Sequence, residues 1–239
     1  MKKGVLFLLL SLFLMGGEGL EYTLIFRGGY RSLKAKIGEK ETSLNLSLTG
    51  IKNSVLISET SEFYFGISYG KTSFGQELTF VSLPISISTS YSKPNYSIYA
   101  GAYWEPYVFS EELSLVLNPE ISYSLSSHQW DVEQSAYLTG SVEGKVHFWD
   151  FRLGVLAMYE GQENIEPYAG VYFDYFWGSV KFTEKFQDLE GQSDEKIRPR
   201  IPVEIVLGSN FYSGEHLSGG ISVGFLNGLS FHGEVGFTF

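Results

Sequence analysis

The chain lacks cysteine and is poor in charged residues. The absence of cysteine excludes disulfides, thiolate catalysis, cysteine ligands for zinc and a lipidated N-terminal cysteine. Charged side chains make up 18% of the chain, whereas ordinary soluble domains carry roughly 25%. The balance is acidic, with 17 Lys and Arg against 27 Asp and Glu, and the sequence contains no basic stripe. Nucleic acid is therefore not expected as a partner.

Long apolar runs are missing after the N-terminal segment. Two lysines precede an apolar run from Val5 to Met15, and glycines follow at the small-residue positions of a cleavage site. This order predicts a secretory signal peptide over residues 1–19, because a membrane-spanning helix needs about 20 apolar residues. A short N-terminal membrane anchor is the alternative. Residues 20–239 contain no predicted transmembrane helix and are expected to form a single barrel domain.

The chain instead alternates with period two from Tyr22 to its end. The longest example runs from Ala136 to Phe148, where Val142 lies between Ser141 and Glu143. Period two predicts β-strands with one apolar and one polar face, and the high aromatic content of 16% also favours strands. Helical periodicity is missing after the predicted signal peptide.

Turn residues divide the alternating region into strands. We expect strands near 22–30, 33–38, 43–50, 54–59, 62–70, 77–90, 96–107, 113–126, 135–148, 151–160, 165–183, 198–209, 217–226 and 229–239. The first four are short enough to merge into two, so about 12 strands are expected, within a range of about 10 to 14. The tight turns are expected at Trp149–Asp150, Gly161–Gln162 and Asn227–Gly228. The charge-rich segment Glu184–Arg200 is predicted to be a loop outside the membrane.

Alternation alone does not say which face meets lipid. A soluble exported barrel turns its apolar face inward and binds an apolar ligand there, whereas a membrane barrel turns that face outward. The polar faces carry few charges, and aromatic residues near strand ends fit interfacial girdles: Trp104, Tyr107, Trp149, Tyr168 and Trp177. We therefore expect an all-β, single up-and-down transmembrane barrel, with Val142 facing lipid. The soluble barrel is the alternative.

The last strand, Leu229–Phe239, alternates to its final residue and ends on phenylalanine. It resembles the C-terminal strand of bacterial outer-membrane β-barrel proteins, in which a terminal aromatic residue and alternate apolar residues are recognised during assembly. The matching residues are Val235, Phe237 and Phe239. The resemblance implies an outer-membrane location, with lipid and the barrel assembly machinery as partners, and it does not identify a subfamily. The last strand is expected to close the ring by pairing with residues 22–30.

If the apolar face points outward, the polar face identifies the lumen. Nine ionisable residues are then expected inside the barrel: Glu120, Glu143, Lys145, His147, Arg152, Asp174, Glu204, His232 and Glu234. A structural network of paired charges is the main interpretation, and a cation-preferring passage is the second, because acids outnumber bases. Inward-facing Tyr99, Tyr103, Tyr172 and Phe176 are expected to narrow the lumen. The predicted function is that of an integral outer-membrane protein with a narrow or plugged barrel, which has a structural role or passes a small solute or cation. A wide general porin is not expected.

Catalysis finds little support in the sequence. Ser126 or Ser127 beside His128 is the nearest approach to a serine–histidine pair, but neighbours in a strand face opposite sides. The G-x-S-x-G and H-E-x-x-H motifs are absent from the sequence. We therefore expect no enzymatic activity, no cofactor, and no catalytic or metal-binding residues. An outer-membrane enzyme is the alternative.

Overall fold

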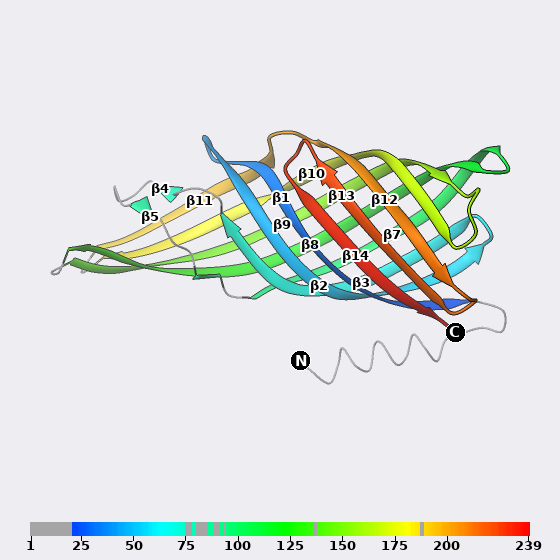
Figure 1. Ribbon diagram of the computed structural model, residues 1–239. Coiled ribbons are helices and arrows are strands. Elements are labelled where there is room, and N and C mark those ends of the chain that lie inside the picture. Colours follow the sequence, from blue (N-terminus) through cyan, green and yellow to red (C-terminus); the bar gives the residue numbers. More distant parts are fainter. Residues whose placement is uncertain are drawn as a thin grey trace.

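A computed structural model describes residues 21–74, 78–79, 86–87, 91–92, 94–135, 138–186 and 189–239, and the predicted signal peptide lies outside them. The described part is all-β, and its antiparallel strands form a long barrel (Figure 1). Among the described residues, there is no helix that is long and apolar enough to cross a membrane. The strands are β1 (Tyr22–Ile37), β2 (Lys40–Ser58), β3 (Ser61–Phe74), β4 (Leu78–Thr79), β5 (Ser86–Ile87), β6 (Tyr91–Ser92), β7 (Pro94–Ser110), β8 (Leu113–Ser135), β9 (Leu138–Tyr159), β10 (Ile165–Phe186), β11 (Leu189–Pro199), β12 (Val203–Ser213), β13 (Leu217–Phe225) and β14 (Ser230–Thr238).

The first and last strands close the ring. β1 pairs with β2 on one side and with β14 on the other, in a register that places Thr23 opposite Thr238. The Phe239 N–H donates to the Tyr22 carbonyl at 2.9 Å. Closure leaves no free sheet edge at this seam, as lipid requires. The main sheet holds 12 strands, so the prediction of an up-and-down barrel of about 12 strands is confirmed, including the merging of the first four segments into β1 and β2.

The barrel narrows along its axis. At the end that carries both termini, called here the terminal end, ten strands form the ring: β1, β2, β3, β7, β8, β9, β10, β12, β13 and β14. The β13–β14 hairpin stops part-way along, and beyond it β11 pairs directly with β1 and β10, with Ala35 opposite Pro199 and Gly178 opposite Ile197. One strand, β11, thus takes the place of three. The narrow part, called here the extension, comprises the described residues of 33–46, 126–148 and 176–200.

The outer surface of the wide part is apolar. Its exposed side chains form a belt, called here the lipid-facing belt, which includes Phe26, Ile67, Ile98, Ile121, Phe151, Phe173, Leu207, Ile221, Phe231 and Val235. Trp149 and Trp177 lie opposite each other on β9 and β10 at the border with the extension, and the Tyr175 and Trp177 rings are 5.7 Å apart. Aromatic side chains at this border are typical of a membrane interface.

The extension has the opposite polarity. Val142, Val146 and Phe148 are buried inside it, whereas Glu143 and Lys145 are exposed on its outer face. The inner side chains form one apolar cluster, called here the plug: Leu33, Ala35, Ile37, Leu44, Leu46, Val142, Val146, Phe148, Phe176, Val180, Phe182 and Ile197, with Leu48 and Phe74 against it. The prediction that Val142 faces lipid is wrong, because this part of β9 lies beyond the lipid-facing belt and follows the polarity of a water-soluble fold.

Two boundaries are corrected as well. Trp149–Asp150 is not a turn, because β9 runs through it without interruption. Glu184–Arg200 is not a loop, because it contains the end of β10 and most of it forms β11, whose outward-facing Asp194, Lys196 and Arg198 are exposed. Most of the strand expected over residues 77–90 lies outside the described residues. Both errors arise because the strands are long. β9 and β10 have 22 residues each, and only the C-terminal half of β9 and the N-terminal half of β10 cross the belt.

Candidate functional site in the barrel lumen

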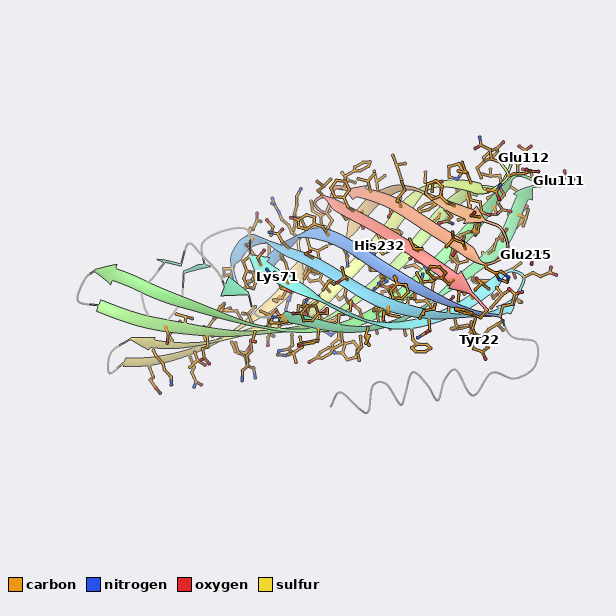
Figure 2. The ribbon with its side chains drawn as sticks, turned by 60° about the horizontal axis from the view of Figure 1, so that its bottom comes forward. Tyr22, Lys71, Glu111, Glu112, Glu215 and His232 are labelled. Carbon is orange, nitrogen blue, oxygen red and sulfur yellow. The ribbon has the colours of Figure 1, made fainter. Side chains whose placement is uncertain are left out.

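The wide part of the barrel encloses a cavity of about 670 Å³. Side chains near the turns of the terminal end line its mouth, and most of the ionisable ones are glutamates: Glu21, Glu59, Glu62, Glu105, Glu160, Glu166 and Glu215. Its inner end is lined by Leu46, Leu48 and Phe148, which belong to the plug or pack against it. The cavity therefore opens toward the terminal end and ends at the plug. Figure 2 shows Glu111, Glu112 and Glu215 at the terminal end.

Two arginines form the inner part of a charge network that crosses the lumen. Arg31 of β1 contacts Asp150 at 2.7 Å and Asp174 at 3.0 Å. Arg152 of β9 contacts Asp174 and Glu204, each at 2.7 Å. The carboxylates are buried, and Asp174 has no exposed surface. A buried carboxylate is costly unless it is paired, so these contacts fix the protonated guanidinium groups and ionised carboxylates together.

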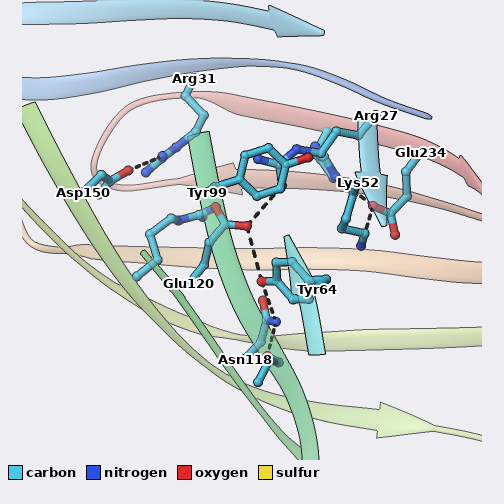
Figure 3. A network of polar contacts seen from close by, with 12 residues as sticks. Arg27, Arg31, Lys52, Tyr64, Tyr99, Asn118, Glu120, Asp150 and Glu234 are labelled. Carbon is cyan, nitrogen blue, oxygen red and sulfur yellow. Dashed lines mark hydrogen bonds and ion pairs between the residues drawn. The ribbon is translucent and has the colours of Figure 1, made fainter. Parts of the chain in front are cut away.

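The network continues toward the cavity mouth (Figure 3). Arg27 contacts Glu120 at 3.1 Å, and the Tyr64 hydroxyl donates to the same carboxylate at 3.3 Å. The Asn118 amide donates to the Tyr64 hydroxyl at 3.1 Å. Lys52 contacts Glu234 at 3.3 Å. Side chains from distant strands are thereby joined across the lumen, and they line the cavity between its mouth and the plug.

The charges of the network nearly cancel. Its four cations are Arg27, Arg31, Lys52 and Arg152, and its five anions are Glu120, Asp150, Asp174, Glu204 and Glu234. Two guanidinium groups also lie over aromatic rings, Arg27 at 3.3 Å from the centre of the Tyr99 ring and Arg152 at 4.3 Å from that of Tyr172. Such stacking holds the planar guanidinium in one orientation. The arrangement is that of a cluster whose charges are paired with one another, although Arg31 Nε and Asp150 Oδ1 are buried without a hydrogen-bond partner among the described residues.

Lumenal tyrosines are held in place by glycines on the neighbouring strand. Each ring lies over a glycine directly opposite it, where any Cβ would collide with the ring. The pairs are Tyr64 with Gly101, Tyr99 with Gly66, Tyr168 with Gly208 and Tyr172 with Gly154. An aromatic ring that covers a cross-strand glycine stabilises a curved sheet. It also fixes the direction of the hydroxyl, and this explains how Tyr64 and Tyr172 meet Asn118.

The structure separates the nine residues that the sequence assigned to the lumen. Six face it: Glu120, Arg152, Asp174, Glu204, His232 and Glu234. Glu143, Lys145 and His147 do not, because they lie on the outer face of the extension. Their assignment is corrected by the reversed polarity described above. His147 Nε2 instead lies 3.4 Å from the Ser179 hydroxyl on β10.

Sequence reasoning missed four members of the network. Arg27, Arg31 and Lys52 alternate with apolar or small residues on β1 and β2, and Asp150 was assigned to a turn. The signal for Arg27 and Arg31 was present, because outward Phe26 and Tyr30 alternate with them. The inward placement of Tyr99, Tyr103, Tyr172 and Phe176 is confirmed. Tyr168, predicted for the interface, lies in the lumen instead.

The remaining candidates are placed as follows. Ser126 is buried and Ser127 faces the other side of β8, while the His128 side chain lies outside the described residues. Within the described part, no group of three or more His, Cys, Asp or Glu side chains is arranged to hold a metal ion. Val235, Phe237 and Phe239 are all exposed on the outer face of the C-terminal segment.

Comparison with known proteins supports the fold. No protein-family model matches the chain, and no curated protein matches it. The translocator domain of the autotransporter NalP from Neisseria meningitidis has a TM-score of 0.52 at 14% identity, covering 100% of this chain and 94% of that one. The outer membrane protease OmpT from Escherichia coli has a TM-score of 0.55 at 8% identity, covering 92% and 94%.

The chain has the fold of bacterial outer-membrane β-barrels. At these identities the likeness extends to the fold alone. The lipid-facing belt supplies the apolar outer surface that an outer-membrane location requires, and the aromatic pair at its border fits the membrane interface.

Proposed function

We propose that the protein is a plugged, non-enzymatic outer-membrane barrel with a structural role, in which the extension stands beyond the exterior face of the membrane. The turns at the terminal end are short, as periplasmic turns are, and the long connection between β3 and β7 leaves from the opposite end. The observation that carries the proposal is the plug. Its members are almost completely buried, and they fill the narrow part of the barrel from one wall to the other.

Physical reasons support a closed lumen. A ring of about 8 strands has an interior just wide enough for its own side chains, so a filled extension leaves no water path. An ion entering the plug would lose its hydration without gaining polar partners, which costs several kcal/mol. Below the plug, the charge network links opposite walls of the lumen but leaves the cavity open between its mouth and the plug. Passage therefore requires the plug to move.

The network also supports a structural role over an enzymatic one. Asp150, Asp174 and Glu204 each contact a guanidinium group, and the Ser230 hydroxyl additionally donates to Glu204. Carboxylates that are engaged with guanidinium groups on other strands are occupied in structural contacts and are not presented to a substrate. Such a cluster joins the strands to one another, which is the role we assign to it.

Cation passage is the second candidate function. The glutamates at the cavity mouth favour it, because rings of carboxylates attract cations and repel anions. In this alternative, the closed state seen here is one of two states, and an opening step displaces the plug.

Conductance in planar lipid bilayers separates the two candidates. We expect the wild-type barrel to be silent across the voltage range. Phe148 and Phe176 pack edge to face in the plug, with 6.3 Å between ring centres, so the double variant F148A/F176A should produce cation-selective openings. The matched control F151A/F173A removes two phenylalanines from the outer face and should stay silent. Steady conductance by the wild-type protein would overturn the plugged state and favour cation passage.

A further inference from the structure

The outer surface is electrically divided between its two ends. The basic side chains on the outer face of the described barrel all lie beyond the lipid-facing belt: Lys34, Lys36, Lys71, Lys145, Lys181, Lys185, Lys196, Arg198 and Arg200. The terminal end carries glutamates instead, as Figure 2 shows for Glu111, Glu112 and Glu215, with Lys71 far from them. In a protein of net charge −10, this separation points to an anionic partner at the extension.

The strongest concentration lies where β1 meets β11. Lys34, Lys36, Lys196, Arg198 and Arg200 project from the outer face there and are called here the β1–β11 patch. Lys36 lies directly opposite Arg198, and the Arg200 N–H donates to the Lys34 carbonyl at 2.9 Å, so cations face cations across the seam. Like charges directly opposite each other destabilise a sheet. The seam therefore carries a cost that an anionic ligand would remove.

The patch has almost no anionic partner of its own. Among the described residues, Glu41 is the one carboxylate within ion-pair distance, at 3.0 Å from Arg200 and 3.8 Å from Lys36. Elsewhere on the extension, both lysines of β10 face an acid on β11, as Lys181 faces Asp194 at 3.7 Å. Lys185 similarly faces Glu190 at 3.6 Å. The β1–β11 seam therefore gathers the largest group of facing cations, and Lys145 opposite Lys181 on β9 and β10 is a smaller case in which Lys181 also has an acid partner.

The surface below the patch is apolar and exposed. The Ser32 N–H donates to the Leu229 carbonyl at 2.9 Å, which places the end of the β13–β14 hairpin beside β1 just below Lys34. Leu226 and Leu229 of this turn are about half exposed, and Phe231 continues the apolar surface downward. Cations stand within two or three residues of lipid-facing side chains. This order matches a lipid whose anionic headgroup lies above its acyl chains.

We propose that the β1–β11 patch binds the phosphate groups of a phosphorylated glycolipid in the exterior leaflet, while the acyl chains pack against Leu226, Leu229 and Phe231. Arginine offers two parallel N–H donors to a phosphate, and lysine adds a point charge. The narrowing of the barrel makes room for the headgroup, because the β13–β14 hairpin ends beneath the patch (Figure 1). This partner gives the extension a role in anchoring that the plugged lumen alone does not predict.

Lipid titration of the folded barrel tests the proposal. The mature protein is placed in phosphatidylcholine nanodiscs, and bound lipid is counted by native mass spectrometry as the fraction of diphosphorylated lipid A is raised. We expect the wild type to retain lipid A and to discriminate against its dephosphorylated form. Because one basic side chain near an anionic lipid surface contributes roughly a fivefold change in affinity, K36Q/R198Q should bind at least about tenfold more weakly.

The control variant K181Q/K185Q removes the same number of charges from positions that have their own acids, and it should bind as the wild type does. Thermal unfolding without lipid A provides a second measurement. K36Q/R198Q should be at least as stable as the wild type there, because it relieves repulsion at the seam, so weaker binding is not a sign of misfolding. Equal binding of both lipid A forms, unchanged binding by K36Q/R198Q, or equal losses in the two variants would overturn the proposal.

Discussion

Arg31 of β1 reaches Asp150 of β9 through the centre of the barrel, with 2.7 Å between Nη1 and Oδ2. At the terminal end, β9 is the fifth neighbour of β1 in both directions, through β2, β3, β7 and β8 on one side and through β14, β13, β12 and β10 on the other. The pair therefore joins opposite walls of the ring. A contact across the full diameter links strands that share no hydrogen bonds, and it sets the width of the lumen.

Removal of this arginine should destabilise the barrel strongly. Arg31→Met leaves Asp150 without its ion-pair partner and Asp174 with Arg152 alone, and breaking a buried pair costs about 3–5 kcal/mol. Urea unfolding in lipid vesicles measures the loss. Lys181→Met, which removes an exposed lysine paired with Asp194, should cost about 0–1 kcal/mol. Equal losses would show that the network contributes no more than a surface ion pair.

The reversal of polarity predicts opposite tolerances for arginine on the same outer face. Ile221 is 59% exposed in the lipid-facing belt, so Ile221→Arg should cost about 2–4 kcal/mol if this position lies near the bilayer midplane. Glu143 is exposed on the extension, so Glu143→Arg should change the free energy of unfolding little. The free energies of unfolding of both variants, measured by urea in lipid vesicles, test this prediction. A large cost for Glu143→Arg would place the extension in lipid.

Labelling of single introduced cysteines can test the orientation of the barrel, because the chain has no cysteine of its own. Gln192 of β11 is exposed on the outer face of the extension. A membrane-impermeant maleimide should therefore label Gln192→Cys on intact cells. Glu215→Cys, at the terminal end, should be labelled only after the outer membrane is permeabilised. The reverse pattern would mean that the extension stands in the periplasm.

The last residue should matter more for assembly than for stability. Phe239 is 69% exposed, and its backbone pairs with Tyr22 at the very end of the seam. Deletion of Phe239 should leave refolding into detergent nearly unchanged but lower the outer-membrane yield in cells sharply, as expected if the barrel assembly machinery reads this residue. Deletion of Leu229–Phe239 should abolish both, because β1 and β13 lose their pairing. Normal yield after the single deletion would contradict a role in recognition.

Most of the fold follows from period two, since alternation, closure by the last strand and the barrel architecture are all readable from the sequence. The sequence does not show in which direction the apolar face of a strand points. Val142 and Phe151 belong to one strand, yet Val142 is buried in the plug and Phe151 faces lipid. Alternation does not show whether the apolar face of a strand points inward or outward, and this direction reverses where β9 leaves the membrane. Glu143, Lys145 and His147 could have indicated this reversal, because three ionisable side chains at alternate positions of one face are more typical of a water-facing surface.

The sequence predicted that charged residues form a network in the lumen, but it did not show which residues pair with each other. Glu120, Asp174 and Glu204 were identified from their own strands, whereas their partners come from strands far away in sequence. Arg31 and Asp150 are separated by 119 positions, and only the closed ring brings them together. The plug was hidden for the same reason, because Leu33, Phe176 and Ile197 become neighbours only when β11 takes the place of the β13–β14 hairpin.

Site-directed spin labelling along β9 tests the central claim most directly. Labels at Phe151→Cys, Val146→Cys and Glu143→Cys in lipid vesicles report access to oxygen, which concentrates in lipid, and to a water-soluble nickel complex. We predict that Phe151 is accessible to oxygen, Glu143 to nickel and Val146 to neither, because the strand passes from lipid to water while its inner face enters the plug. Oxygen access at Glu143 equal to that at Phe151, or nickel access at Val146, would contradict a plugged barrel with a reversed exterior extension.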